Sequence, residues 1–396
     1  MKLYITEKGT ADCAKTVVAE DMILTKELPT TAGSKMLEGY ESLFDAEVVT
    51  RLKEAGFVVD AKANVGEMGI DFLGETSYFG ACIDENGKLV SASAKILEKA
   101  EAKAVIALDV NGAPRRAAAL SGKVFIKPTY GVVSRYGTIP AACSGETVGV
   151  MAEKAGTCRE ILSVISGHDD KDGTSLSEEK CELVKQSSGK QIKKIAVAKA
   201  LYDMASKEVA EDLDRFVEKA KAKGICVEEI DAKELLLAKP AWCVLMSAEV
   251  CNNVSRYDGV KYGHRCEKYT NIDELYTGSR TEGFGFNLKK TILYGSETLS
   301  DENYMRVYDK ALRIRRVLCE YLTELFKSYD AVVMPACTNK SYDYEKVKAQ
   351  KDIAYDESVY TSVASITGLP AIVCEGVQLI ANAFDDSALL ELAEKI

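Results

Sequence analysis

The sequence contains few of the residues that several functional classes need. Its 396 residues include two histidines, His168 and His264, seven prolines, and twelve cysteines without a Cys-x-x-Cys pair. The scattered cysteines and the two distant histidines argue against a zinc ribbon and favour a reducing, cytoplasmic compartment, in which cysteine acts as a small apolar residue. We therefore expect neither a bound metal nor a cofactor.

Basic residues are fewer than acidic residues in this chain. The chain has 51 Lys and Arg residues against 61 Asp and Glu residues, which gives a formal net charge of −10. A polyanion is repelled by such a chain unless basic residues gather locally, so we expect no direct nucleic-acid binding. No apolar run approaches the length of a bilayer span, and Met1 is not followed by a targeting segment, so we also expect no membrane association.

Helical and buried-strand patterns alternate along the chain. Apolar residues share one helical face after Asp45, which can cap the helix, and Gly56 stops that helix before a short apolar run at residues 57–59. Residues 206–227 repeat this order, and residues 104–108 and 331–334 are continuous apolar runs typical of buried strands. The alternation predicts an α/β fold, with helices covering both faces of a large mixed sheet.

Domain organisation follows from the same pattern. Residues 168–191 form the most polar stretch and are predicted to be a surface connection. Because the α/β pattern continues on both sides of this stretch, we expect residues 1–396 to form a single domain. Residues 301–327 are predicted to form one long helix.

Six short blocks occur in an order that resembles a known family. Residues 125–137, which contain Lys-Pro-Thr-Tyr-Gly, resemble the segment after the catalytic loop of amidase-signature enzymes. Within that family they are most similar to the A subunits of glutamyl-tRNA(Gln)/aspartyl-tRNA(Asn) amidotransferases. The other blocks are residues 30–38, 167–175, 255–263, 282–285 and 368–370. The resemblance implies one α/β/α domain around a mixed sheet, here with a shortened N-terminal helical region.

The resemblance also implies a catalytic triad, and this sequence departs from it. The family uses a serine nucleophile, a second serine held by a cis peptide, and a lysine. A gapless count from the block at residues 125–137 aligns Ala113 with the nucleophile, and the other two positions hold Leu89 and Glu20. Serine is a weak nucleophile until a neighbouring base takes its proton, so losing these groups predicts loss of amide hydrolysis.

Residues that shape the loop are retained, whereas those that recognise substrate are not. Asp109, Gly112 and Arg115 keep the frame of the nucleophile loop, and Asn111 replaces a glycine whose backbone conformation asparagine tolerates. Further candidate pocket residues come from the later blocks. They are Arg256, Asp258, Tyr262, Lys290, Thr291 and Ser358. Thr291 replaces an arginine and Ser358 an acidic residue, so a glutamine substrate would lose partners at both ends.

Three functions stay open at this point. The favoured hypothesis is a catalytically inactive binding or scaffold subunit that takes a partner or a small amide or amino-acid-like ligand. The first alternative is a working A subunit that hydrolyses glutamine and supplies ammonia to B-like and C-like subunits. The second is an amidase with a rebuilt site, in which Glu20 acts as a general base. Ser93 and Ser121 are the alternative nucleophiles and Lys95 and Lys127 the alternative bases, although caps and surface groups explain such residues more simply.

Overall fold

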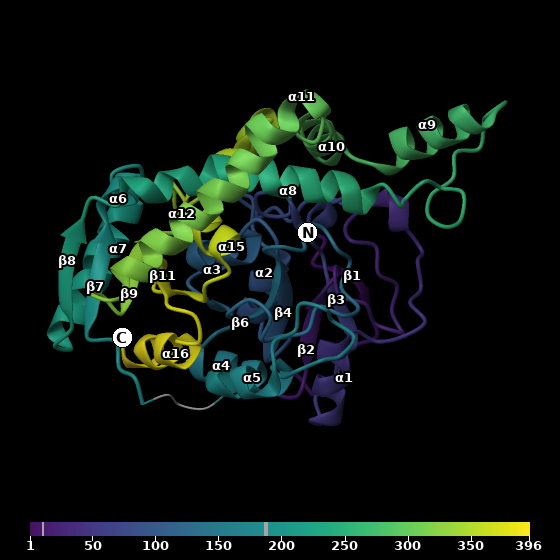
Figure 1. Cartoon of the computed structure of the whole chain (residues 1–396). Helices are drawn as coiled ribbons and strands as arrows, with labels where there is room; N and C mark the ends of the chain where they lie inside the picture. Colours follow the sequence, from purple (N-terminus) through teal and green to yellow (C-terminus); the bar gives the residue numbers. More distant parts are fainter. Residues whose placement is uncertain (10–11, 186–188) are drawn as a thin grey trace.

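The computed structural model describes residues 1–9, 12–185 and 189–396 (Figure 1). Its centre is an eleven-stranded mixed sheet with the strand order β1-β3-β2-β4-β6-β5-β10-β11-β9-β7-β8. In that order, the strands span Tyr4–Glu7, Ala61–Ala63, Val17–Glu20, Ala104–Asp109, Thr147–Ala152, Val124–Lys127, Ala371–Cys374, Val377–Ala381, Ala331–Pro335, Lys194–Ala198 and Cys226–Ile230. The sheet combines parallel pairs such as β2–β4 with antiparallel pairs such as β4–β6, as the α/β prediction requires.

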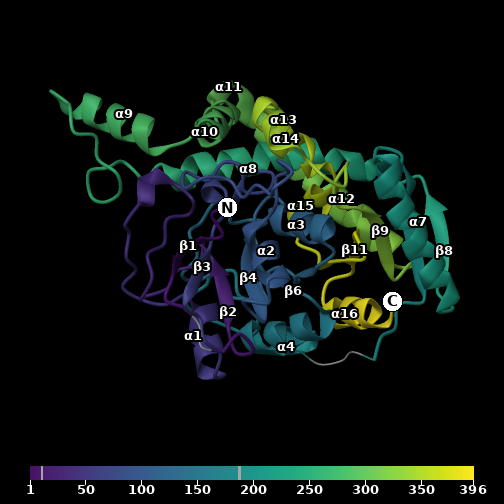
Figure 2. The same ribbon diagram turned by 180° about the vertical axis from the view of Figure 1, so that it is seen from behind.

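Helices cover both faces of this sheet. On one face, α2 (Ala92–Glu98) and α3 (Ala113–Ser121) pack against the central strands, and on the other lie α4 (Ala155–Ile165) and α16 (Asp386–Lys395) (Figures 1 and 2). Successive residues of one strand, such as Phe125 and Ile126, enter different apolar clusters because neighbouring strand side chains point to opposite faces.

In the described part of the chain, ten further α-helices lie between β7 and β10, and one of them, α7, packs against β8, β9 and β11. In chain order, these helices are α6 Lys199–Tyr202, α7 Lys207–Ala222, α8 Ala238–Val254, α9 Ile272–Gly283, α10 Phe286–Thr298, α11 Asp301–Asn303, α12 Asp309–Leu325, α13 Tyr344–Ala349, α14 Ile353–Asp356 and α15 Ser358–Thr367. The long helix α8 packs against α10, α12 and α15, and its Trp242 is fully buried. Figures 1 and 2 both show α9 projecting beyond the rest of the molecule.

Two predicted segments differ in detail. The polar stretch at residues 168–191 includes the helix α5 (Glu178–Lys185), while its residues 186–188 lie outside the described part of the chain. The long helix predicted at residues 301–327 consists of α11 and α12 joined by a π-helical segment, Tyr304–Tyr308. A last helix, α1 (Glu47–Glu54), packs against α4.

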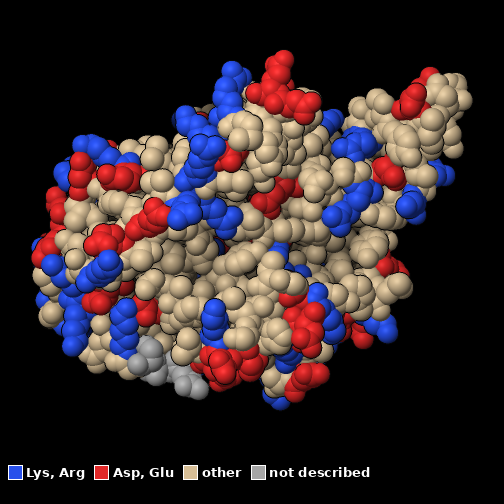
Figure 3. Space-filling view, in the orientation of Figure 1, with Lys and Arg blue, Asp and Glu red and all other residues tan. Residues whose placement is uncertain are grey.

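Three further observations bear on function. Acidic and basic side chains are interspersed over the face shown in Figure 3, so that view has no continuous basic surface. Among the described residues, no helix combines the length and apolar composition needed to cross a bilayer. The same residues contain no group of three or more His, Cys, Asp or Glu side chains that could hold a metal ion.

Candidate functional site

A small cavity brings together two of the three positions that the resemblance aligns with the triad. Glu20 ends β2 and Ala113 begins α3, and both line a cavity of about 30 Å³. This volume is close to that of one or two water molecules. Gly66, Gly69 and Asp71 contribute to the opposite wall.

The backbone of the β4–α3 loop explains how Ala113 reaches the cavity. β4 ends at Asp109, whose Oδ1 accepts a hydrogen bond from the backbone N–H of Gly112 at 3.0 Å. Gly112 has a φ of 85°, and a Cβ built on it would lie 2.3 Å from the Cβ of Thr361. Only glycine fits this turn, which directs the chain from the strand end into the helix.

Glu20 is a buried carboxyl group with one hydroxyl partner. Burial raises its pKa to about 8, and the nearby Asp109 charge acts in the same direction. The hydroxyl of Ser93, in α2, donates a hydrogen bond to Glu20 Oε1 at 2.9 Å and partly opposes this shift. Ser93 is itself buried and does not line the cavity. At neutral pH, therefore, Glu20 is mainly protonated and is a poor base.

Asp71 is a second buried carboxyl group in the cavity wall, and sequence reasoning did not identify it. Burial and the neighbouring Glu75 raise its pKa, while Arg116 opposes the shift. Its Oδ1 has no hydrogen-bond partner among the described residues. No motif pointed to Asp71, because an aspartate in a glycine-containing loop is indistinguishable in sequence from a solvated one.

Asp109, Asn111 and Arg115 form the support of the loop. The Arg115 guanidinium binds both carboxylate oxygens of Asp109, with Nε–Oδ2 at 2.7 Å and Nη2–Oδ1 at 3.0 Å. It also donates to the backbone oxygen of Thr361 at 2.7 Å, and Asn111 Nδ2 donates to the backbone oxygen of Ala354 at 3.0 Å. All of these polar groups are buried, so the network fixes the turn and leaves Arg115 no free donor for a ligand.

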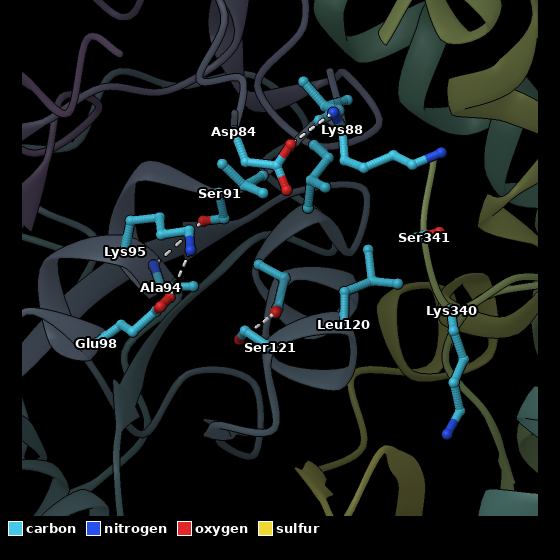
Figure 4. Close-up of a pocket in the computed structure, with 14 residues that line it drawn as sticks. Asp84, Lys88, Ser91, Ala94, Lys95, Glu98, Leu120, Ser121, Lys340 and Ser341 are labelled. Carbon is cyan, nitrogen blue, oxygen red and sulfur yellow. Dashed lines mark hydrogen bonds and ion pairs between the residues drawn. The ribbon is translucent and has the colours of Figure 1, made fainter. Parts of the chain in front are cut away.

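Leu89 does not line the cavity of Glu20 and Ala113. It lines an adjoining cavity of about 250 Å³ that shares only Leu73, Ser91 and Ala117 with the first (Figure 4). The described residues contain no cis peptide bond. Ser91 caps α2 by accepting a hydrogen bond from the backbone N–H of Ala94 at 3.4 Å.

Lys290, Thr291 and Ser358 gather around Tyr355. The Thr291 hydroxyl lies 2.8 Å from the Tyr355 hydroxyl, and Ser358 donates to the Tyr355 backbone oxygen at 2.7 Å. The Lys290 ammonium lies 5.2 Å from the Tyr355 ring centroid and pairs with Asp352 at 2.9 Å. These polar groups are therefore partnered within the chain.

The residues predicted from the block at 255–263 lie at the base of the α9 projection. Arg256 donates to the backbone oxygen of Asn253 at 2.8 Å, and Asp258 accepts from the backbone N–H of Val260 at 2.8 Å. Tyr262 is 42% exposed, and none of the three lines either of these cavities.

The alternative nucleophiles and bases lie in different surroundings. Ser93 is neither a cap nor a surface group, contrary to the simpler explanation, because it is buried against Glu20. Ser121 donates to the backbone oxygen of Ala117 at 2.6 Å, and Lys95 pairs with Glu98 at 2.7 Å. Lys127 is buried, which lowers its pKa to about 7, and it donates to the backbone oxygen of Leu369 at 3.1 Å.

The chain belongs to the amidase family, whose family model matches residues 17–84 and 99–390. It is similar to the A subunit of the glutamyl-tRNA(Gln) amidotransferase of Coxiella burnetii (strain Dugway 5J108-111), with 33% identity over 96% of this chain and 82% of that protein. The corresponding protein of Acinetobacter baumannii (strain ATCC 17978) is 34% identical over 95% of this chain and 80% of its own length.

Solved structures agree with this placement. The A subunit of the Thermotoga maritima glutamyl-tRNA(Gln) amidotransferase superposes with a TM-score of 0.80 at 27% identity, covering 100% of this chain and 87% of that one. The K. lactis urea amidolyase shares the fold, with a TM-score of 0.81 at 22% identity over 96% of this chain and 22% of that one.

Between its two matched stretches, the family model leaves residues 85–98 of this chain unmatched. This interval contains Leu89, Ser91 and Ser93 together with the whole of α2. The shared fold defines the family, whereas the activity depends on the residues of the site.

Proposed function

We propose that this amidase-family protein does not hydrolyse amides and acts as a binding or scaffold subunit. The observation that carries the proposal is the shared cavity of Glu20 and Ala113. A methyl group offers no nucleophile, and a carboxyl group with a pKa of about 8 is a weak base at neutral pH.

The surroundings of Tyr355 support the same proposal. Thr291 and Ser358, which stand where the resemblance places charged substrate-binding residues, satisfy their hydroxyl groups on Tyr355. A glutamine molecule would have to break these contacts without gaining a charged partner in return. Loss of recognition thus accompanies loss of the reacting groups.

Ammonia release tests the proposal directly. The purified protein is incubated with glutamine, asparagine and simple amides, and ammonia is measured by a coupled enzyme assay. We expect no release above the protein-free blank across pH 6 to 9. Turnover that disappears in Glu20→Gln but persists in the surface variant Glu218→Gln would overturn the proposal.

One observation favours a second candidate, an amidase with a rebuilt site. Ser93 donates to Glu20 at 2.9 Å, which is the arrangement of a hydroxyl nucleophile and its base. In this reaction, the Ser93 proton would move to Glu20 as the Ser93 oxygen attacks the amide carbonyl. Glu20 would then return the proton to the departing amine as the C–N bond breaks, and water would hydrolyse the resulting ester of Ser93 to release the acid. The candidate predicts activity that rises towards pH 8 as Glu20 ionises and that is lost in Ser93→Ala. Ser163→Ala, on the exposed face of α4, is the matched control.

The relatives named as amidotransferase A subunits suggest assembly with other subunits. An exposed apolar surface extends over the α9 to α12 region and is a candidate contact area for such partners. It includes Tyr276, Phe286, Leu293, Tyr304 and Met305. Co-expression with B-like and C-like amidotransferase subunits distinguishes the functions. A complex without glutamine-dependent ammonia release supports the scaffold, whereas a complex that releases ammonia supports a working A subunit.

A further inference from the structure

Half of the residues that line the larger cavity come from the interval that the family model leaves unmatched. Of its fourteen lining residues, seven lie between Lys88 and Glu98, within that interval. Figure 4 shows the cavity enclosed by the loop at residues 84–91, helices α2 and α3, and the segment at Lys340 and Ser341. Its volume of about 250 Å³ exceeds that of the neighbouring cavity severalfold.

Asp84 and Lys88 are held at fixed positions on the rim. The backbone N–H of Asp84 donates to the Lys88 backbone oxygen at 2.9 Å, and Asp84 Oδ1 accepts from the Lys88 N–H at 2.8 Å. Gly87 closes the turn with a φ of 75°, and Ile83 and Leu89 form an antiparallel bridge at its base. This tight hairpin fixes the Asp84 carboxylate and the backbone of Lys88 before any ligand arrives, which lowers the entropic cost of binding.

The charges of the cavity do not all cancel within the protein. Lys95 pairs with Glu98 at 2.7 Å, and Lys340 pairs with Asp212 outside the cavity. By contrast, among the described residues neither the Lys88 ammonium nor the Asp84 carboxylate has an ion-pair partner. In Figure 4 the second carboxylate oxygen of Asp84 points into the cavity, and the Lys88 side chain extends towards Ser341. One anion and one cation are therefore available to a ligand.

Neutral groups complete the site. The Ser91 oxygen accepts from Ala94, which leaves its O–H free to donate, and within the described chain the Ser341 hydroxyl is unpartnered. The side chains of Leu73, Leu89 and Leu120 supply apolar surface between these polar groups. A ligand that fits must combine a carboxylate, a short apolar chain and a cationic amine.

We propose that this cavity binds a small amino-carboxylate, with Lys88 and the serine hydroxyls on its carboxylate and Asp84 on its ammonium group. The Asp84 carboxylate disfavours dicarboxylates and phosphates, because it would repel a second anionic group. The site adjoins the cavity of Glu20 and Ala113 and shares Leu73, Ser91 and Ala117 with it. It uses neither Glu20 nor Ala113, so this inference does not depend on whether the protein hydrolyses amides.

Isothermal titration calorimetry with a matched set of probes tests the proposal. The set contains glycine, β-alanine and γ-aminobutyrate, together with butyrate, which lacks the amine, and butylamine, which lacks the carboxylate. We expect at least one amino-carboxylate to bind the full-length protein at least about tenfold more tightly than either single-charge analogue. If no amino-carboxylate binds more tightly than these analogues, the proposal is wrong.

Variants that each remove one charge show which residue binds which end of the ligand. Lys88→Met should weaken amino-carboxylate binding by at least about tenfold, and Asp84→Asn should remove the preference over butyrate while keeping the backbone contacts of Oδ1. Lys154→Met, on an exposed residue outside the cavity, is the control and should bind as the unmodified protein does. Circular dichroism verifies that each variant is folded. Binding unaffected by both cavity substitutions would place the ligand elsewhere and refute the site.

Discussion

Replacing Glu20 by glutamine should flatten the pH dependence of the free energy of unfolding. In the folded chain, burial raises the pKa of Glu20 from its ordinary value of 4.5 to about 8. The unfolded chain releases this proton near pH 4.5, whereas the native protein retains it up to about pH 8. Between these values, the native state binds one more proton, so stability falls as the pH rises.

The size of the effect follows from proton linkage. One proton difference changes the free energy of unfolding by about 1.4 kcal/mol per pH unit. Between pH 5.5 and 7.5, Glu20 should therefore remove about 2–3 kcal/mol of stability, with the slope decreasing as the native group begins to ionise. Glutamine has nearly the same shape and still accepts the Ser93 hydrogen bond, so Glu20→Gln removes the titration with little loss of packing.

Urea unfolding followed by circular dichroism measures this difference. Glu67 and Asp386 also have raised pKa values, to about 7 and about 6, and contribute to the total slope. The informative quantity is therefore the slope of the unmodified protein minus that of Glu20→Gln, with the exposed Glu218→Gln as the control. Equal slopes for the unmodified protein and Glu20→Gln would show that Glu20 is ionised in the native state, which would refute the protonated carboxyl group.

Three further predictions concern the support of the site. Arg115→Lys should lower the free energy of unfolding by about 3–5 kcal/mol, because lysine cannot bind the buried Asp109 carboxylate through two donors. Thermal unfolding measures the loss, and an unchanged transition would contradict the role of the Arg115–Asp109 network. Burial lowers the pKa of Lys127 to about 7, so above this pH the unfolded chain binds more protons than the native protein and the free energy of unfolding rises with pH. Lys127→Met should remove this rise, and urea titrations at pH 7 and pH 9 measure it. Gly112→Ala should destabilise the protein far more than Gly122→Ala. Both glycines have a positive φ, but only a Cβ added at Gly112 would meet Thr361. Similar shifts of the thermal unfolding midpoint in the two variants would contradict the close contact.

Local signals made part of the fold predictable from the sequence. The helix pattern from Ser206 corresponds to α7, and Ser206 accepts a hydrogen bond from the backbone N–H of Val209 at 3.4 Å. Such caps are encoded within a few residues. The predicted cap at Asp45 is wrong, because α1 begins after Ala46 and the Asp45 carboxylate instead pairs with Lys53 at 2.7 Å. Asp45 Oδ1 also accepts a hydrogen bond from the backbone N–H of Lys26 at 2.8 Å, and a local helix pattern does not contain that contact.

Contacts distant in sequence also limited the prediction of the site. The family blocks predicted that Glu20 and Ala113 belong to one region, and both line the same cavity. The partners of Glu20 could not be predicted, because Ser93 is 73 residues away and its hydrogen bond depends on how α2 packs against the central strands β4 and β6. Asp71 was missed for the same reason. The apolar run at residues 57–59 forms only one isolated bridge, from Val58 to Thr16, since strand formation requires a neighbour to pair with.

The position of the β10–β11 hairpin near the end of the chain determines when the sheet can be completed during synthesis. Strands β1 to β6 form one half of the sheet and β7 to β9 the other, and in the described chain this late hairpin joins them. A ribosome-bound chain that has not yet exposed residues 371–381 therefore holds two partial sheets with open, apolar edges. Chaperone occupancy should accordingly persist until these residues have emerged, and a stop codon placed before Ala371 should yield aggregating protein.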